Sequence, residues 1–230
     1  METETSETFQ LCTVEEGIVV DMSGIVNKDF YWDANYRIAW VLKETNSGDP
    51  DFEICKWLDT YLPIDKKVPR RIALASYGIL NDEEDCYGLN PNNYDVKSSL
   101  RDIAWINISD ESGGSSTSYS RLKYLYRKNR GRVLSILEEV EPNIIILCGT
   151  CSVLWDDLTG DWFEYELRKL KFYDYDIGIG AYTQEEGDSP LFLETRHPGE
   201  RSMSDRDYAS QIIQAVRAWE DGCFDFAEGW

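Results

Sequence analysis

The sequence has no hydrophobic run that approaches the roughly 18 to 20 residues needed to cross a membrane. Its opening segment, METETSETFQ, also lacks the positive charge and following apolar stretch that mark a secretory signal. We therefore expect a cytoplasmic protein with no membrane segment.

Positive charge is scarce too, because 23 Lys and Arg residues stand against 43 Asp and Glu residues, for a formal net charge of -20. This excess opposes unspecific contact with polyanions such as DNA.

The sequence is also poor in histidine and in closely spaced cysteine pairs. Histidine occurs once, as His197, and the six cysteines are spread along the chain. Cys148 and Cys151 have the spacing of a redox or metal-binding pair, but no second such pair accompanies them. We expect reduced thiols, no bound metal and no cofactor. Cys148 ends an apolar run, which favours a thiol packed in the core over redox or metal chemistry.

The length and composition allow one domain. A chain of 230 residues with 42% hydrophobic content can bury a full core. We predict an acidic N-terminal tail over residues 1–16, a single domain over residues 17–221, and an acidic, aromatic C-terminal tail over residues 222–230.

Four short apolar runs alternate with segments of helical periodicity. The expected strands lie within residues 37–43, 102–109, 143–150 and 191–199, the last of which runs into a Pro-Gly turn, and the last helix begins after a capping residue, Ser204. Strands that alternate with helices predict right-handed crossovers and an α/β three-layer sandwich, with a central, mostly parallel four-stranded sheet flanked by helices. Such sheets bind ligands beyond the carboxyl ends of their strands.

The residues at those strand ends form a pattern. Glu44 follows the first strand, Asn107 ends the second, Gly149 follows the third, and His197 follows the fourth. The surrounding text reads VLKETNSG, AWINIS, NIIILCGT and RHPGERSMS. The order of these motifs resembles that of the uracil-DNA glycosylase superfamily, over roughly residues 37 to 215.

The resemblance implies a role for each motif residue. Glu44 would hold or deprotonate the attacking water, and His197 would donate a hydrogen bond to the departing base. Asn107 would bind the edge of a flipped pyrimidine, with Asn46 and Phe52 in the same base pocket. The chain departs from the family in two of these motifs. Lys, Thr and Asn replace Gly, Ala and Pro around the acid, and the last motif reads His-Pro-Gly instead of His-Pro-Ser.

A basic stretch interrupts the acidic sequence. Between Glu111 and Glu138 there is no acidic residue, and tyrosines are interleaved with the bases. Guanidinium groups bind phosphates and rings stack on bases, so this stretch is predicted to bind DNA. The expected DNA-binding residues are Arg121, Lys123, Arg127, Lys128 and Arg130, together with Arg201 and Met203, which would fill the space left by the flipped base.

Together these features predict a monofunctional DNA glycosylase, which hydrolyses the N-glycosidic bond of an abnormal or modified pyrimidine and leaves an abasic site. The base would be uracil or a hypermodified cytosine of phage DNA, as in anti-phage defence. One alternative is a catalytically silent protein of this fold that binds nucleic acid or, through its acidic surface, a basic protein. Another is a glycosylase of free nucleosides or nucleotides. Each site residue also has a simpler interpretation, because Glu44 can be a solvated loop charge, and His197 and Asn107 can be turn residues.

Overall fold

The four predicted apolar strands form the centre of one sheet. They are β2 (Ile38–Glu44), β3 (Ile103–Ser109), β4 (Ile144–Cys148) and β7 (Leu191–Thr195). All three pairings among them, β2 with β3, β2 with β4, and β4 with β7, are parallel. Their side chains are mostly buried on both faces, as expected for parallel strands covered on both sides. These features come from a computed structural model that describes residues 23–44, 52–111, 113, 117–172, 179–185 and 189–227.

The sheet is larger than predicted and is mixed. It has eight strands in the order β1-β3-β2-β4-β7-β6-β5-β8. The added strands are β1 (Gly24–Ile25), β5 (Leu167–Phe172), β6 (Gly180–Gln184) and β8 (Phe224–Phe226), and they pair antiparallel. The prediction of a mostly parallel four-stranded sheet was therefore wrong. β1 and β8 are too short to show a periodicity, and β5 carries three basic residues, which is unlike an apolar strand.

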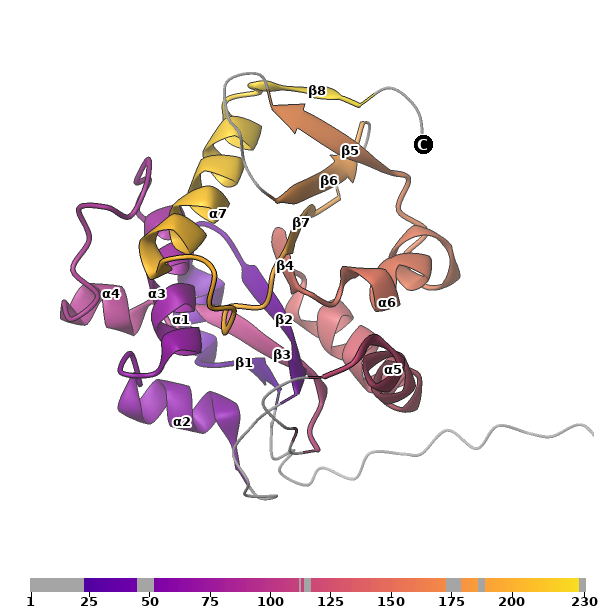
Figure 1. The fold of residues 1–230 in the computed structure, drawn as a ribbon, viewed down its shortest axis with the longest axis horizontal. Coiled ribbons are helices and arrows are strands. Elements are labelled where there is room, and N and C mark those ends of the chain that lie inside the picture. The colour runs from indigo at the N-terminus through magenta and orange to yellow at the C-terminus, as the bar shows by residue number, and fades with distance from the viewer. Residues whose placement is uncertain are drawn as a thin grey trace, which may run out of the picture.

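Helices cover both faces of the sheet (Figure 1). They are α1 (Lys28–Asp33), α2 (Ile54–Tyr61), α3 (Lys67–Leu80), α4 (Tyr94–Ser98), α5 (Tyr119–Val140), α6 (Cys151–Asp156) with the π-helical turn η1 (Asp157–Asp161), and α7 (Asp205–Glu220). α3 and α7 pack together on one face, and α5 and α6 lie on the other. Ser204 caps α7 as predicted, because its side chain accepts a hydrogen bond from the Asp207 N–H. No helix in the described ranges is both long and apolar enough to cross a bilayer.

The core is divided by the sheet into two halves. Trp40 and Cys148 belong to the half beneath α3 and α7, whereas Val41 and Cys151 belong to the half beneath α5. Burial raises the pKa of both the Cys148 and the Cys151 thiol to about 12. The two thiols are therefore protonated and packed on opposite faces of the sheet.

Candidate active site

The strand order reverses beside β2. From β2 the chain crosses to β3 on one side, and from β4 it crosses to β7 on the other. In an open parallel sheet, such a reversal leaves a crevice beyond the carboxyl ends of the two strands. Lys43 and Glu44 end β2, and Gly149 and Thr150 directly follow β4. These residues therefore lie where this class of sheet binds its ligands.

Lys43 lies across the turn after β4 and reaches the segment after β7. A Cβ atom at Gly149 would be 3.3 Å from the Lys43 Cε, 3.6 Å from its Nζ and 3.8 Å from the backbone nitrogen of His197. Gly149 has a φ of +68°, and its N–H donates to the Thr195 carbonyl at 2.8 Å. Glycine is required here by the left-handed backbone and by the close approach of Lys43. The ends of β2, β4 and β7 thus meet at Lys43, Gly149 and His197.

His197 is held as a neutral ring of defined tautomer. Its Nδ1 accepts a hydrogen bond from the Gly199 N–H at 3.0 Å, so the ring proton resides on Nε2. Burial, followed by the positive charge of Lys43, lowers the pKa of His197 to about 4. At neutral pH this side chain therefore offers an uncharged Nε2–H donor.

The pKa of His197 offers a direct test of this arrangement. His197 is the only histidine in the chain, so its ring protons give the only histidine signals that titrate in an NMR spectrum. We expect these signals to report a pKa of about 4. Lys43→Met should raise that pKa, because the nearby positive charge is removed. The value should stay below 6.5, since burial is the larger cause. A titration unchanged by the substitution would show that Lys43 does not lie beside the ring.

Glu44 is covered by the segment after β3. The Thr117 hydroxyl donates to Oε1 of Glu44, and a Cβ atom at Gly113 would overlap the Glu44 side chain. The second carboxylate oxygen, Oε2, is buried and accepts no hydrogen bond from the residues that the structure describes. A buried carboxylate oxygen of this kind needs a donor, and a water molecule or a substrate hydroxyl is the simplest one. Glu44 is therefore partly buried, with Oε1 hydrogen-bonded to Thr117 and Oε2 shielded from solvent.

Asn107 is buried inside β3, where the sequence had predicted a base-recognition residue at its end. It is only 2% exposed, and its Oδ1 accepts a hydrogen bond from the Trp105 indole at 3.2 Å. Its backbone N–H donates to the Ser23 hydroxyl at 3.0 Å, and the Arg132 guanidinium donates to its carbonyl at 2.9 Å. Asn107 is therefore anchored in the core beside the Leu42 position of β2.

The two other predicted base-pocket residues have different outcomes. Phe52 is half-buried against the core, with its ring 5.4 Å from that of Trp57. Asn46 lies outside the described residues. Of the five residues predicted for catalysis and base binding, the structure brings His197 to the switch point and Glu44 to the end of the adjoining strand.

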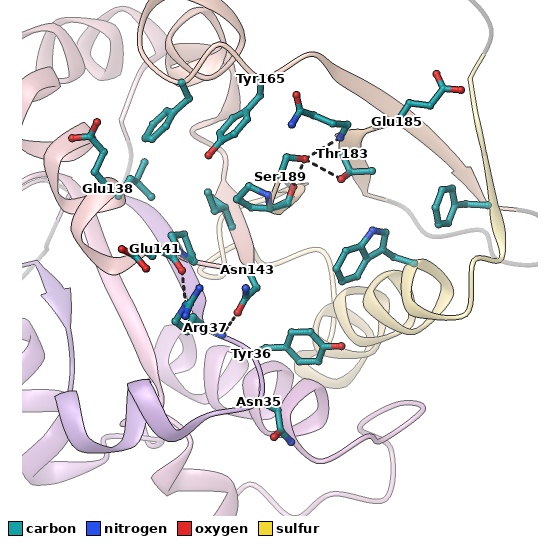
Figure 2. A pocket seen from close by; sticks show the side chains of 18 of the residues that line it. Asn35, Tyr36, Arg37, Glu138, Glu141, Asn143, Tyr165, Thr183, Glu185 and Ser189 are labelled. Atoms are coloured by element: carbon teal, nitrogen blue, oxygen red, sulfur yellow. Dashed lines mark hydrogen bonds between the residues drawn. The ribbon is translucent and has the colours of Figure 1, made fainter. Parts of the chain in front are cut away.

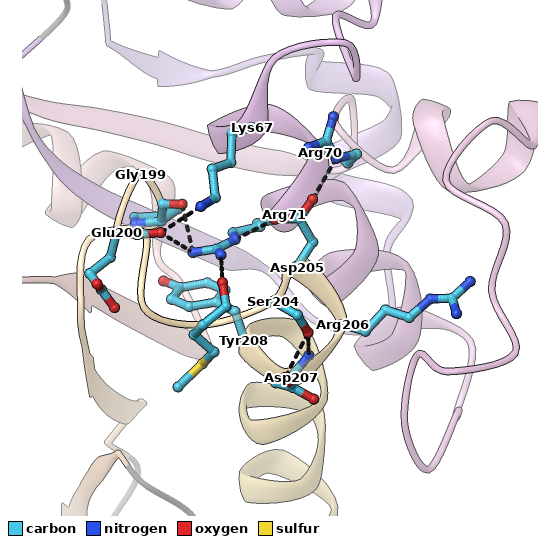
Figure 3. Close-up of polar contacts among 12 residues, drawn as sticks. Lys67, Arg70, Arg71, Gly199, Glu200, Ser204, Asp205, Arg206, Asp207 and Tyr208 are labelled. Atoms are coloured by element: carbon cyan, nitrogen blue, oxygen red, sulfur yellow. Dashed lines mark hydrogen bonds and ion pairs between the residues drawn. The ribbon is translucent and has the colours of Figure 1, made fainter.

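The segment after His197 is held by a buried arginine that sequence reasoning missed. Arg71 of α3 has no solvent exposure. Its guanidinium donates to the Pro198 and Glu200 carbonyls, each at 3.0 Å, to the Met203 carbonyl, and to Asp205 Oδ1 at 2.7 Å (Figure 3). One side chain thus fixes three backbone positions in the segment from Pro198 to Met203. The only signal in the sequence was a pair of arginines in an otherwise apolar helix.

Neighbouring groups complete this clamp. Lys67 donates to the Glu200 carbonyl at 2.7 Å, and Tyr208 donates to the Arg196 carbonyl at 2.9 Å. Asp205 is partly buried, which acts to raise its pKa, but hydrogen bonds from Arg71 and Arg70 outweigh burial and lower it. The His197 loop is therefore tied on both sides to α3 and α7.

The predicted DNA-binding residues separate into two groups. Arg121, Lys123 and Arg127 are exposed on α5 and form no ion pair within the described residues. Lys128 forms an exposed ion pair with Glu111. Arg130 instead binds the buried carboxylate of Asp157 and lies 5.5 Å from the centre of the Trp162 ring.

α5 connects the carboxyl end of β3 to the start of β4, so its first turns lie at the same edge as Glu44. Arg121 and Lys123 belong to those turns. Arg201 is exposed in the loop beyond His197, whereas Met203 is half-buried and packs against the core. Four exposed basic residues, Arg121, Lys123, Arg127 and Arg201, therefore lie on α5 and on the loop beyond His197, two segments that begin at the carboxyl edge of the parallel strands.

No family model matches the chain, and no curated protein matches its sequence with significance. Functional interpretation therefore depends on the geometry of these residues.

Proposed function

We propose that this protein is a monofunctional DNA glycosylase that releases an abnormal or modified pyrimidine and leaves an abasic site. The observation that carries the proposal is the neutral His197 ring, which lies beside Lys43 at the switch point of the sheet. Its Nε2–H donates no hydrogen bond to the residues that the structure describes. A departing pyrimidine develops negative charge on its carbonyl oxygen. A fixed hydrogen-bond donor in a site shielded from water stabilises such charge without reorganisation.

Glu44 supplies the second half of the chemistry. Breaking the N-glycosidic bond leaves an oxocarbenium-like sugar, which a nearby carboxylate stabilises. Glu44 Oε2 would accept a proton from the attacking water, whose oxygen bonds to the sugar carbon while the electron pair of the broken bond leaves with the base. Oε2 is buried and accepts no hydrogen bond from any residue in the described part of the chain, which supports this role because a buried carboxylate oxygen needs a donor.

DNA would approach over the exposed basic residues Arg121, Lys123, Arg127 and Arg201. They lie on segments that begin at the edge carrying His197 and Glu44, where their positive charge would offset the overall negative charge along a phosphate backbone. Four neutralised phosphates would give a slope of log affinity against log salt of about -3 to -4.

The test is base release, measured by mass spectrometry, from DNA that carries uracil, unmodified cytosine, 5-hydroxymethylcytosine or its glucosylated form. We expect release of one of these bases from the polymer, together with an abasic site that is cleaved by mild alkali. Equal release from the matching free nucleoside would instead indicate an enzyme of free nucleosides. Absence of release from every substrate by the folded protein would contradict the proposal.

A catalytically silent binding protein is the second candidate, and Asn107 favours it. The carbonyl oxygen of its amide already accepts a hydrogen bond from Trp105 in the core, so it is not directed at a base edge in this structure. A silent protein would bind DNA, or a basic partner, without releasing any base. The same mass-spectrometric experiment, combined with a binding measurement, separates the two candidates.

A further inference from the structure

A large cavity lies at the edge of the sheet opposite the candidate active site. Its volume is about 910 Å³, and residues that precede the parallel strands line it: Arg37 before β2, Asn143 before β4, and Pro190 before β7 (Figure 2). At about 3.3 Å per residue, the five residues of β4 separate it from Gly149 by roughly 17 Å. The cavity is therefore a separate site from that around His197 and Glu44.

Two groups of aromatic rings line the cavity. Phe163 and Tyr165, which follow η1, are stacked with their centres 5.4 Å apart. The other rings are those of Tyr36, of Trp219 in α7, and of Phe224 and Phe226 in β8. All six rings are only partly buried. Partly exposed aromatic faces inside a cavity favour a ligand with a flat or apolar part that can stack on them.

The charge at the rim is negative. Glu138 and Glu141 lie on one side of the cavity and Glu185 on the other (Figure 2). The only basic residue that the structure places in the lining is Arg37, whose Nε donates to the Glu141 carbonyl at 2.6 Å and whose guanidinium lies 5.7 Å from the Trp32 ring centre. The three carboxylates therefore exceed the positive charge of the lining. An anionic ligand would be repelled here, and an apolar one would leave the carboxylates without counter-charges.

The same region already shows how a cation is held. The Arg168 guanidinium lies 4.7 Å from the centre of the Phe226 ring and forms an ion pair with Glu185. This ion pair is exposed, and such pairs contribute little to stability, so an incoming arginine can compete for the same carboxylate and ring. Stacking on an aromatic face together with a carboxylate contact is the arrangement that proteins use to bind organic cations.

We infer that this cavity binds a basic peptide segment of a partner protein, with an arginine side chain stacked on the aromatic rings and directed at Glu138 and Glu141. The acidic surface of this chain would thereby have one defined docking point for a basic partner. The inference is independent of the proposed glycosylase activity, because the cavity and the His197 site share no residue.

The experiment is a fluorescence-anisotropy titration at physiological salt with a labelled arginine-rich peptide and the same peptide carrying citrulline in place of arginine. Citrulline keeps the shape of arginine and removes its charge. We expect binding of the arginine peptide only. The double variant Glu138→Gln/Glu141→Gln should weaken binding by about tenfold or more. Trp219→Leu should also weaken it, without any change in net charge.

A matched control separates a site from general attraction to an acidic protein. Glu84→Gln/Asp156→Asn removes the same charge from two exposed residues outside the cavity and should leave the affinity within about twofold. Equal weakening by both double variants, or equal binding of the two peptides, would overturn the inference. Base release measured on the same variants is expected to match that of the wild type, so failure of either proposal is visible separately.

Discussion

Replacement of Arg71 by methionine should lower the free energy of unfolding by about 3 to 5 kcal/mol. Methionine fills much of the same space but donates no hydrogen bond. The carbonyls of Pro198 and Met203 would then lose their Arg71 donor in the interior, at about 1 to 3 kcal/mol each. Asp205 would lose one of its two arginine partners. Chemical denaturation of the wild type and the variant, followed by circular dichroism, measures the difference.

Arg70→Met is the matched control, because Arg70 adjoins Arg71 in α3 and binds the other oxygen of Asp205. Its side chain is 29% exposed and holds no carbonyl of the His197 loop, so its loss should cost about 1 kcal/mol or less. Arg71→Lys should fall between the two, since an ammonium group cannot reach all four acceptors of a guanidinium fork. Equal destabilisation by Arg70→Met and Arg71→Met would contradict the clamp.

Substitutions of the two proposed catalytic residues should have the largest effect on activity. Glu44→Gln should slow base release by about 10² to 10⁴-fold, because an amide cannot accept the proton of the attacking water. His197→Ala should slow it by about 10² to 10³-fold, because the developing charge on the base loses its donor. Single-turnover release from the substrate identified by mass spectrometry measures both. Neither variant should lose the fold, since His197 lies in a loop outside the core clusters and glutamine can still accept from Thr117.

The pH dependence of the reaction distinguishes the roles of these residues. With a pKa of about 4, His197 stays neutral down to that pH and gains a proton only below it. Wild-type activity should therefore show no change that depends on His197 between pH 5 and 8, about one pH unit or more above that pKa. A fall in activity centred near pH 6.5, absent in His197→Ala, would show that the ring titrates normally and is not held neutral. Glu139→Gln is the control, because Glu139 is exposed on α5 near the edge of the sheet opposite the candidate active site. This variant should release base at the wild-type rate.

Local pattern was sufficient to locate much of the fold. The four parallel strands are continuous apolar runs, and burial on both faces is the reason that parallel strands have this composition. The N-cap at Ser204 could also be read directly, because capping depends on a few neighbouring residues. The position of Glu44 and His197 after two of these strands followed from the same pattern.

Contacts between distant segments decided the rest. Asn107 was predicted to face a ligand, but Trp105, Ser23 and Arg132 engage it in the core. Arg130 was predicted to bind DNA, but it neutralises the buried Asp157. A sequence does not show which partner a polar side chain will meet, because that depends on how segments far apart in the chain pack.

The clearest example is Arg71, which lies 126 positions before His197 and yet supports the loop that carries it. In the sequence it is one of three basic residues in a helix that is otherwise mostly apolar. A buried charge is stable only where several acceptors converge on it, and that convergence exists only after α3, α7 and the end of β7 have packed together. Strand composition and helix caps are written in neighbouring residues, whereas the neutral histidine, its nearby lysine and the arginine clamp are products of the assembled fold.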